Sequence, residues 1–414
     1  MLFRSRAEDV GIVAVDDHTL RISLVQSAPF FVGMMAHQFF KVVPRQTIER
    51  HGTSWTRPEN IVTSGPFLLE EWRPYDRLVV RRNPMYWDAA TVRLDEIRFY
   101  PIIEITTMMN LYKAGAVDAT YNHTVPASWL PLIKGKKDYM DAPENAIEYY
   151  TFNTTKAPMN DVRVRKAFNM AIDKQALADF RVVAKPLTAF TPEGIFPGYP
   201  QPRGDQFDPA RARELLAEAG FRAADGTYSP AAFPIADVEI LYNTTESNRQ
   251  IAEFIQQQWK QHLRLTVPLR NMEFRTYLPA RSDMKYKGFA RSGWIGDYMD
   301  PYTFLELVAV PSPGTNNTTG WFDPQYVGML EKANATIDPQ QRYALLAQAE
   351  AYMLEVQPLI PLLTRATDFM KKPYVKGFYP NPGTLHPWKF VYIEHDPAKW
   401  DYGMPDMTSA SPAS

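Results

Sequence analysis

The chain has 414 residues, more than one small hydrophobic core accommodates, so we expect two or more lobes. Hydrophobic residues make up 45% of the chain and charged residues 22%, and the formal net charge is −1. This balance provides neither a basic surface for nucleic acid nor a polybasic patch for membrane lipids. The absence of cysteine excludes thiol catalysis, disulfide bonds and thiolate metal sites.

No apolar run reaches the length of about 18 residues that a transmembrane helix needs, so no membrane span is expected. Residues 1–9 lack the apolar core and the small-residue cleavage site of a signal peptide. We therefore expect no export signal in the chain as given.

The first part of the chain alternates between strand-like and helix-like patterns. Two strands are predicted within 10–27, about a turn at 16–18, and a helix follows through 47–49. Further strands are predicted from residue 67, over 78–82 and over 97–101, then an amphipathic helix over 105–112 and a strand over 117–121. This alternation favours an α/β lobe.

The pattern restarts near residue 146. Asn160 and Asp161 are predicted to cap one helix, and Asp208 with Pro209 to open another that ends at Gly220. We also expect strands at 149–153, 240–243 and 263–267, helices at 251–259 and 339–355, and a polar loop at 311–320. The tail at 403–414 is predicted to be disordered.

The stretch 292–301 (SGWIGDYMDP) places a single carboxylate, Asp297, among glycines and aromatic residues. Gly293 and Gly296 let the backbone approach a ligand, and Trp294 excludes water, which strengthens a charge interaction. The pattern predicts a counter-ion for an ammonium group. A turn with a capping aspartate is the alternative that spacing alone leaves open.

Searches for catalytic and metal-binding motifs find none. The seven histidines contain no pair at i, i+4 spacing and no His-Glu-x-x-His pattern. Phosphate-loop, Gly-x-Gly-x-x-Gly and Gly-x-Ser-x-Gly patterns are also missing. Asp300 and Pro301 are typical of a cap that opens a helix over 302–307, so Asp300 is not expected to form an acid–base pair with Asp297. We therefore expect no enzymatic activity, no cofactor and no metal.

Several segments, in order, resemble the extracellular solute-binding proteins of family 5, which are receptors of ABC importers for oligopeptides, dipeptides and other solutes. The segments are 62–67 (VTSGPF), 83–87 (NPMYW), 160–168 (NDVRVRKAF), 210–221 (ARARELLAEAGF), 241–244 (LYNT) and 294–297 (WIGD). The likeness is strongest to the oligopeptide receptors and extends from about residue 9 to about residue 395. It implies a periplasmic-binding-protein-like α/β fold of type II (cluster C), in which two lobes joined by hinge strands enclose the ligand in a cleft.

The resemblance also implies a division of the chain. It assigns 46–145 and 385–402 to an incomplete lobe I, 146–384 to lobe II, and 1–45 to the remnant of a third, N-terminal lobe. Because most of that third lobe and the signal peptide have no counterpart here, we interpret the sequence as an N-terminally truncated member. That interpretation makes independent folding of 1–45 doubtful and predicts unpaired sheet edges.

The same resemblance implies roles for ligand-binding residues. Asp297 matches the carboxylate that binds a peptide's α-ammonium, and Arg291 and Arg281 match arginines near its carboxylate end. Gly293, Trp294 and Gly296 match a strand that pairs with an extended peptide. The remaining matches are the polar cleft residues Asn122, Tyr149 and Asn243 and the pocket histidine His37, while Asn248 stands where the oligopeptide receptor has a histidine.

Each role has a structural alternative. Both arginines are as well explained by pairing with neighbouring carboxylates, Trp294 by a place in the core, and His37 by a satisfied position on the surface. Tyr149 and Asn243 are also explained by a role in turns.

The predicted function is that of a monomeric periplasmic receptor that binds oligopeptides by backbone and termini and delivers them to the permease subunits of an ABC importer. Ligand would favour a closed state through its higher affinity for that state. The alternatives are a receptor for dipeptides, murein peptides, sugar derivatives, nickel or haem, a hydrolase on the same scaffold, and an inactive fragment.

Overall fold

The computed structural model describes residues 11–182 and 184–403, so most of the predicted disordered tail lies outside the described residues. The chain divides into two compact units. Unit 1 holds the described residues of Met1–Phe39, Tyr149–Asp173 and Thr188–Pro361. Unit 2 holds those of Phe40–Glu148, Lys174–Leu187 and Leu362–Ser414.

Two long strands pass from one unit into the other along the chain. They are β6 (Tyr139–Phe152) and β11 (Leu359–Met370). The other strands of unit 1 are β1 (Ile12–Ala14), β2 (Leu20–Ile22), β8 (Glu239–Asn243), β9 (Leu269–Met272) and β10 (Gly288–Ile295). Its helices are α1 (Phe31–Met34), α5 (Val162–Met170), α7 (Pro209–Glu218), α8 (Glu246–Leu263), α9 (Phe274–Ser282), α10 (Tyr302–Leu305), α11 (Pro324–Ala335) and α12 (Pro339–Val356).

Unit 2 contains shorter strands and helices. Its strands are β3 (Phe67–Arg73), β4 (Arg77–Arg82), β5 (Glu96–Phe99), β7 (Lys185–Pro186), β12 (Val375–Lys376) and β13 (Tyr392–Ile393). Its helices are α2 (Arg45–His51), α3 (Ile105–Lys113), α4 (Leu130–Ile133) and α6 (Lys174–Arg181).

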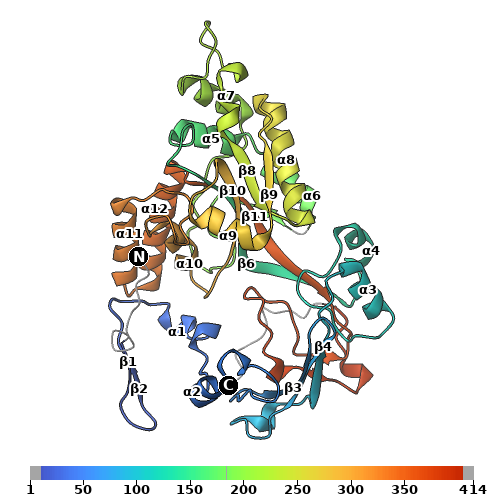
Figure 1. The fold of residues 1–414 in the computed structure, drawn as a ribbon. Coiled ribbons are helices and arrows are strands. Elements are labelled where there is room, and N and C mark those ends of the chain that lie inside the picture. The colour runs from blue at the N-terminus through green and yellow to red at the C-terminus, as the bar shows by residue number, and fades with distance from the viewer. Residues whose placement is uncertain (1–10, 183, 404–414) are drawn as a thin grey trace. The chain divides into compact units, whose positions relative to one another are not determined.

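The largest sheet has six strands in the order β7-β11-β6-β10-β8-β9. Strands β10, β8 and β9 are parallel, with Ala290 opposite Leu241 and Leu241 opposite Arg270. Strand β6 is antiparallel to β10. The amide of Asn153 donates to the carbonyl of Gly288, and two residues earlier the hydroxyl of Thr151 donates to the carbonyl of Ala290. The parallel strands β8 and β10 therefore end at the same sheet edge (Figure 1).

The core of unit 1 forms where helix α8 packs on this sheet. Of the apolar face predicted for this helix, Ile251, Ile255 and Trp259 are buried and Phe254 is half-buried. The Trp259 ring lies 4.5 Å from that of Phe289 on β10, and its indole donates to the carbonyl of Phe168 at 2.9 Å. Aromatic burial of this kind stabilises each element by roughly 2 kcal/mol per ring.

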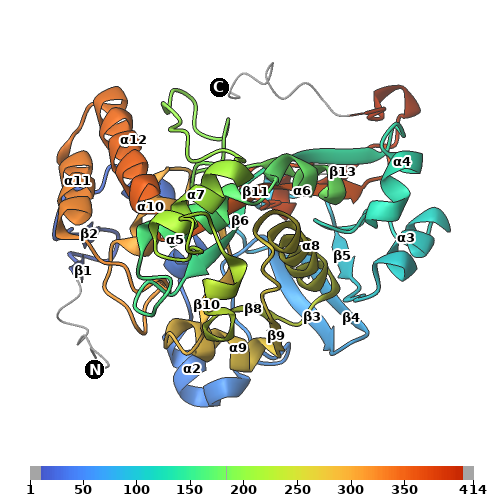
Figure 2. The same cartoon turned by 90° about the horizontal axis from the view of Figure 1, so that it is seen from above.

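Aspartates begin the helices that the sequence predicted. The side chains of Asp161, Asp208 and Asp338 each accept a hydrogen bond from a backbone amide in the first turn of α5, α7 and α12. Proline follows the last two of them, where its missing amide costs nothing. Helices α11 and α12 lie side by side in both views (Figure 1 and Figure 2).

The three-stranded sheet β3-β4-β5 of unit 2 is antiparallel, with Val80 opposite both Leu69 and Ile97. A register shift between Leu69 and Glu71 marks a bulge in β3. Elsewhere in unit 2, α3 buries Met109 and Tyr112 against a cluster that includes Leu130. The apolar face predicted for 105–112 accounts for this packing.

Two predicted strands are wrong. Residues 117–121 form only an isolated bridge, between Ala119 and Lys371. At 263–267, Leu263 still belongs to α8, Arg264 ends that helix in the left-handed conformation, and the strand begins only at Leu269. The apolar residues Leu263, Leu265 and Val267 are buried without a continuous ladder partner, whereas Tyr121 is 44% exposed and Val117 and Ala119 are half-buried.

The unit boundaries also differ from the predicted lobe boundaries. Residues 174–187 and 362–384, predicted for lobe II, fall in unit 2. The pairing of β7 with β11, where Leu363 lies opposite Pro186, accounts for both segments together.

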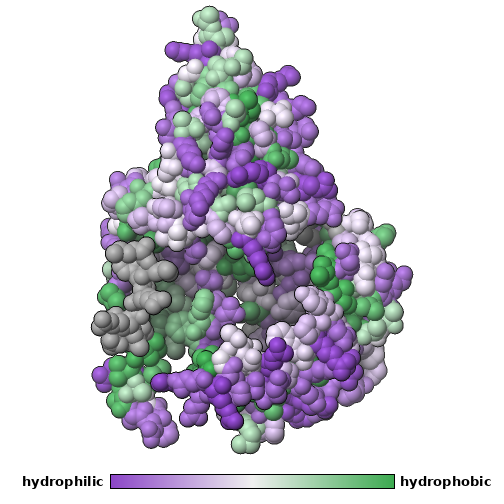
Figure 3. Space-filling model, in the orientation of Figure 1, coloured by the Kyte–Doolittle hydropathy of each residue, from purple (hydrophilic) through white to green (hydrophobic). Residues whose placement is uncertain are grey.

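The described part of the predicted N-terminal remnant is thinly packed. None of the described residues in 11–45 is buried. The β1–β2 hairpin leaves Ile12, Val13 and Leu20 between 46% and 60% exposed, and apolar side chains are visible there (Figure 3). Across the described ranges, no helix is long and apolar enough to cross a membrane.

Candidate functional site

The predicted ligand residues of unit 1 gather at the carboxyl edge shared by β8 and β10. Strand β10 carries Arg291, Gly293 and Trp294, and the turn after it carries Gly296 and Asp297. Because binding sites of open α/β sheets form where parallel strands end, this edge is the expected place for a ligand.

Asp297 has a partly open carboxylate on a fixed backbone. Its side chain is 42% exposed, and its Oδ1 lies 3.6 Å from Nε2 of His37. Burial raises the pKa of Asp297 above its usual 3.8, while the nearby His37 acts in the opposite direction. The backbone amide of Asp297 donates to Oγ1 of Thr303 at 3.2 Å, which holds the backbone of the residue in place.

Thr303 is a site residue that the sequence analysis missed. Its fully buried hydroxyl also accepts a hydrogen bond from the indole of Trp294 at 3.2 Å. One hydroxyl thus holds both the Trp294 ring and the backbone of Asp297. No local pattern identified it, because a threonine in a first helical turn is ordinary.

Aromatic rings pack against the turn that carries Asp297. The Phe30 ring stacks on Tyr298 at 4.8 Å and on Tyr302 at 5.0 Å. The hydroxyl of Tyr298 donates to Oε1 of Glu306 at 2.9 Å. Burial raises the pKa of Glu306 to about 7, although the Tyr298 hydrogen bond lowers it in part.

Asp300 has the capping role predicted for it. Its Oδ1 accepts from the amide of Tyr302 at 2.9 Å, at the start of α10. Both carboxylate oxygens also bind the buried Arg342 guanidinium, at 2.5 and 2.9 Å. Both carboxylate oxygens of Asp300 are therefore hydrogen-bonded within the protein.

The two predicted arginines lie on neighbouring elements, Arg281 on α9 and Arg291 on β10. Nη1 of Arg281 donates to Oγ of Ser292 at 2.7 Å, and its guanidinium lies 5.7 Å from the Tyr277 ring centre. The Tyr277 hydroxyl donates to the carbonyl of Arg291. Arg281 thus donates to a hydroxyl group. The alternative explanation for this arginine was pairing with a neighbouring carboxylate.

Asn243 and Tyr149 lie on the strands that flank β10. The side chain of Asn248 donates to Oδ1 of Asn243 at 2.9 Å and to its carbonyl at 3.1 Å, and both residues are buried. Tyr149 is buried with its ring edge-on to Phe190 at 5.0 Å. Asn248 therefore orients Asn243 within the protein.

Asn122 is the predicted ligand residue that belongs to unit 2. Its Nδ2 donates to the carbonyl of Thr384 at 3.0 Å, and its Oδ1 accepts from Oγ1 of Thr367 at 3.0 Å. Nε2 of His386 lies 3.0 Å from the same Oδ1. Burial lowers the pKa of His386 to about 4, so this histidine is neutral. These contacts occupy the Asn122 amide.

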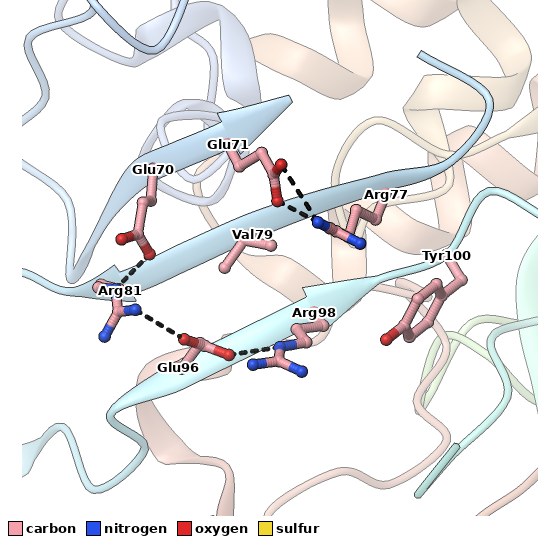
Figure 4. A pocket seen from close by; sticks show the side chains of 8 residues that line it. All are labelled: Glu70, Glu71, Arg77, Val79, Arg81, Glu96, Arg98 and Tyr100. Atoms are coloured by element: carbon pink, nitrogen blue, oxygen red, sulfur yellow. Dashed lines mark hydrogen bonds and ion pairs between the residues drawn. The ribbon is translucent and has the colours of Figure 1, made fainter. Parts of the chain in front are cut away.

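A hollow of about 470 Å³ lies elsewhere, on one face of β3-β4-β5 (Figure 4). Its charged side chains pair across strands: Nη2 of Arg81 lies 3.2 Å from Glu96, and Nε of Arg77 lies 2.7 Å from Glu71. None of the predicted ligand residues lines it. Within 11–182 and 184–403, no group of three His, Asp or Glu side chains is placed to hold a metal ion.

Comparison with known proteins identifies the family. Residues 2–316 match the model described as bacterial extracellular solute-binding proteins, family 5 Middle. The periplasmic oligopeptide-binding protein OppA of Salmonella typhimurium is 32% identical over 387 residues, which is 90% of this chain and 68% of the relative. The probable deoxycholate-binding periplasmic protein YgiS of Escherichia coli is 34% identical over 394 residues, or 92% and 70%.

Solved structures agree. The periplasmic oligopeptide-binding protein OppAIV of Borrelia burgdorferi superposes with a TM-score of 0.79 at 32% identity, covering 94% of this chain and 76% of that one. The predicted fold class, a periplasmic-binding-protein-like α/β fold of type II, is confirmed. The chain therefore belongs to family 5 of the bacterial extracellular solute-binding proteins.

Proposed function

We propose that this protein is a periplasmic receptor that binds oligopeptides and delivers them to the permease subunits of an ABC importer. The relatives support this function: the Salmonella protein is named a periplasmic oligopeptide-binding protein, and the Borrelia structure an oligopeptide ABC transporter protein. No covalent step is part of the proposal, and the receptor acts as a monomer.

The observation that carries the proposal is the state of Asp297. Its carboxylate is partly exposed, its backbone is held by Thr303, and its ion-pair contact is a histidine at 3.6 Å. An ammonium group at hydrogen-bond distance would form a stronger, charge-assisted contact than this one. Asp297 is therefore the residue proposed to bind the peptide's amino terminus.

The rest of the edge supplies groups for a peptide backbone and carboxylate. Gly293 and Gly296 carry no side chain, and they lie beyond Gly288–Ala290, the part of β10 that pairs with β8, so an extended peptide can approach the backbone there. Arg281 and Arg291 provide guanidinium groups for the carboxylate end. Trp294 lies on the same strand and excludes water beside the ligand.

The test is calorimetric binding of trialanine to the wild type and to Asp297→Asn. We expect the substitution to weaken binding about tenfold, or about 1.4 kcal/mol, since the carboxylate is partly screened by solvent. Asp283→Asn is the matched control, because Asp283 is equally exposed at 43% and pairs with Lys285 in the same unit. Unchanged affinity of Asp297→Asn would rule out the ammonium assignment.

A second candidate ligand is deoxycholate, favoured by the 34% identity to the probable deoxycholate-binding protein YgiS. Deoxycholate carries a carboxylate and no amino group, so its binding would not depend on Asp297. Binding of deoxycholate with equal affinity by the wild type and Asp297→Asn, together with no binding of trialanine, would replace the first proposal. Release of free alanine from trialanine by the purified protein would instead indicate a hydrolase.

A further inference from the structure

His37 reaches Asp297 from a distant part of the chain. It follows α1 in the N-terminal segment, and its side chain is only 18% exposed. The stacking of Phe30 on Tyr298 and Tyr302 fixes this segment against the turn that carries Asp297. The contact between His37 and Asp297 is therefore built into unit 1 and does not result from a chance surface position.

Hydrogen bonding determines which ring nitrogen faces the acid. The backbone amide of Phe39 donates to Nδ1 of His37 at 3.4 Å, so Nδ1 must carry a lone pair in the neutral ring. The proton of the neutral ring then sits on Nε2, the nitrogen that faces Oδ1 of Asp297. Protonation replaces the Nδ1 lone pair and places a full positive charge beside the carboxylate.

Two further acids, Asp300 and Glu306, lie around this turn, and burial together with the charge of Asp297 raises the pKa of Glu306 to about 7. Asp300 binds Arg342, and Glu306 accepts from the hydroxyl of Tyr298. The Phe39 ring lies 4.9 Å from the imidazole and adds no charge. Asp297 is therefore the acid that the His37 ring contacts.

We propose that protonated His37 is an internal competitor for Asp297, taking the electrostatic place of a ligand's ammonium group in the ligand-free protein. This inference rests on the proposed function. A protonated His37 repels a second cation at the same carboxylate, so the ammonium group binds more tightly when His37 is neutral. Affinity for ligands with a free amino group consequently falls as the pH falls.

The experiment is calorimetry of trialanine binding at pH 7.5, 6.5 and 5.5, in two buffers that differ in ionisation enthalpy. We expect the wild type to lose about tenfold in affinity between the extremes and to release protons on binding at the lower pH. His37→Gln keeps a polar group without the charge, and should lose less than about half as much affinity on a logarithmic scale. His18→Gln, an exposed histidine of the same unit, should behave as the wild type.

Protonation of Asp297 and of the nearby Glu306 lowers affinity in all these proteins, so the difference between the wild type and His37→Gln isolates the imidazole. Equal pH dependence in the two proteins would overturn the proposal. Proton uptake on binding, or weaker binding by His37→Gln at pH 5.5, would also overturn it, because His37 would then assist the ligand.

A second measurement separates this inference from the proposed function. If trialanine binds to none of the proteins, the peptide assignment fails, and ¹⁵N spectra of the His37 ring decide the competitor model. We expect the Nε2–H tautomer at pH 8 and a change in its Nε2 resonance in Asp297→Asn. An Nδ1–H tautomer, or a resonance that ignores Asp297→Asn, would contradict the pairing.

Discussion

Charged residues are organised in opposite ways at the β10 edge of unit 1 and on the β3-β4-β5 face of unit 2. On the sheet face, Arg81 contacts both Glu70 and Glu96, and Nε of Arg77 lies 2.7 Å from Glu71 (Figure 4). At the β10 edge, Asp297 has a histidine at 3.6 Å.

This difference shows how a surface hollow is told apart from a binding edge. A hollow whose charges satisfy one another offers a ligand little, since each new contact must break an existing one. An acid that is held in place without a short ion pair gains most from an arriving cation. The size of the hollow on β3-β4-β5 is therefore a poor guide to function.

The largest expected effect concerns the pairing that supports the β10 edge. Replacing Arg342, which is 3% exposed, by methionine leaves Asp300 as a buried acid without its partner. We expect a loss of about 3–5 kcal/mol in unfolding free energy, measured by urea titration with fluorescence detection. Arg45→Met, which removes an exposed pair with Glu49, should cost less than about 1 kcal/mol. Similar losses in both variants would contradict this account.

Glu306 gives the next effect, through pH. Its pKa is about 7 in the folded protein against the usual 4.5, so the folded state retains a proton that the unfolded chain releases between these values. The free energy of unfolding therefore falls as the pH rises from about 4.5 to about 7, by at most about 3 kcal/mol. Glu306→Gln removes this decline. An identical pH profile of stability in the variant would refute the assignment.

Thr303→Val should have an intermediate effect on ligand affinity. The substitution leaves the Trp294 indole and the Asp297 amide without their shared acceptor. We expect trialanine to bind more weakly by about 1–2 kcal/mol in calorimetry. Thr303→Ser keeps the hydroxyl and serves as the control. If valine and serine variants bind alike, the hydroxyl does not position the site.

The smallest effect is expected on the sheet face. Arg81→Met removes contacts to Glu70 and Glu96 that are exposed to solvent. We expect a loss of stability of at most about 1 kcal/mol, which disappears at high salt, and no change in trialanine affinity. A clear loss of binding would make this face part of the ligand site and end the comparison drawn here.

Local patterns were sufficient for much of the fold. The Asp-Pro pairs at 208–209 and 338–339 begin helices because the carboxylate caps the first turn and proline lacks an amide that would need a partner. On α8, Ile251, Ile255 and Trp259 are buried as their spacing predicted. The family could also be predicted, because its motifs are short segments that survive at about 30% identity.

Local patterns failed where a segment's partner decides its state. Residues 117–121 alternate like a strand, but only Ala119 finds a bridge partner. Whether such a segment becomes a strand depends on a neighbour that its own sequence does not specify.

The sequence by itself predicted the family, the capped helices that begin after Asp161 and Asp208, and Asp297 as the candidate ligand-binding acid. Only the tertiary structure decided which groups surround that acid. His37 lies 260 positions before Asp297, and Asp300 finds Arg342 on another helix. Periodicity and capping act over a few residues, whereas pairing between charges depends on the packing of the whole unit.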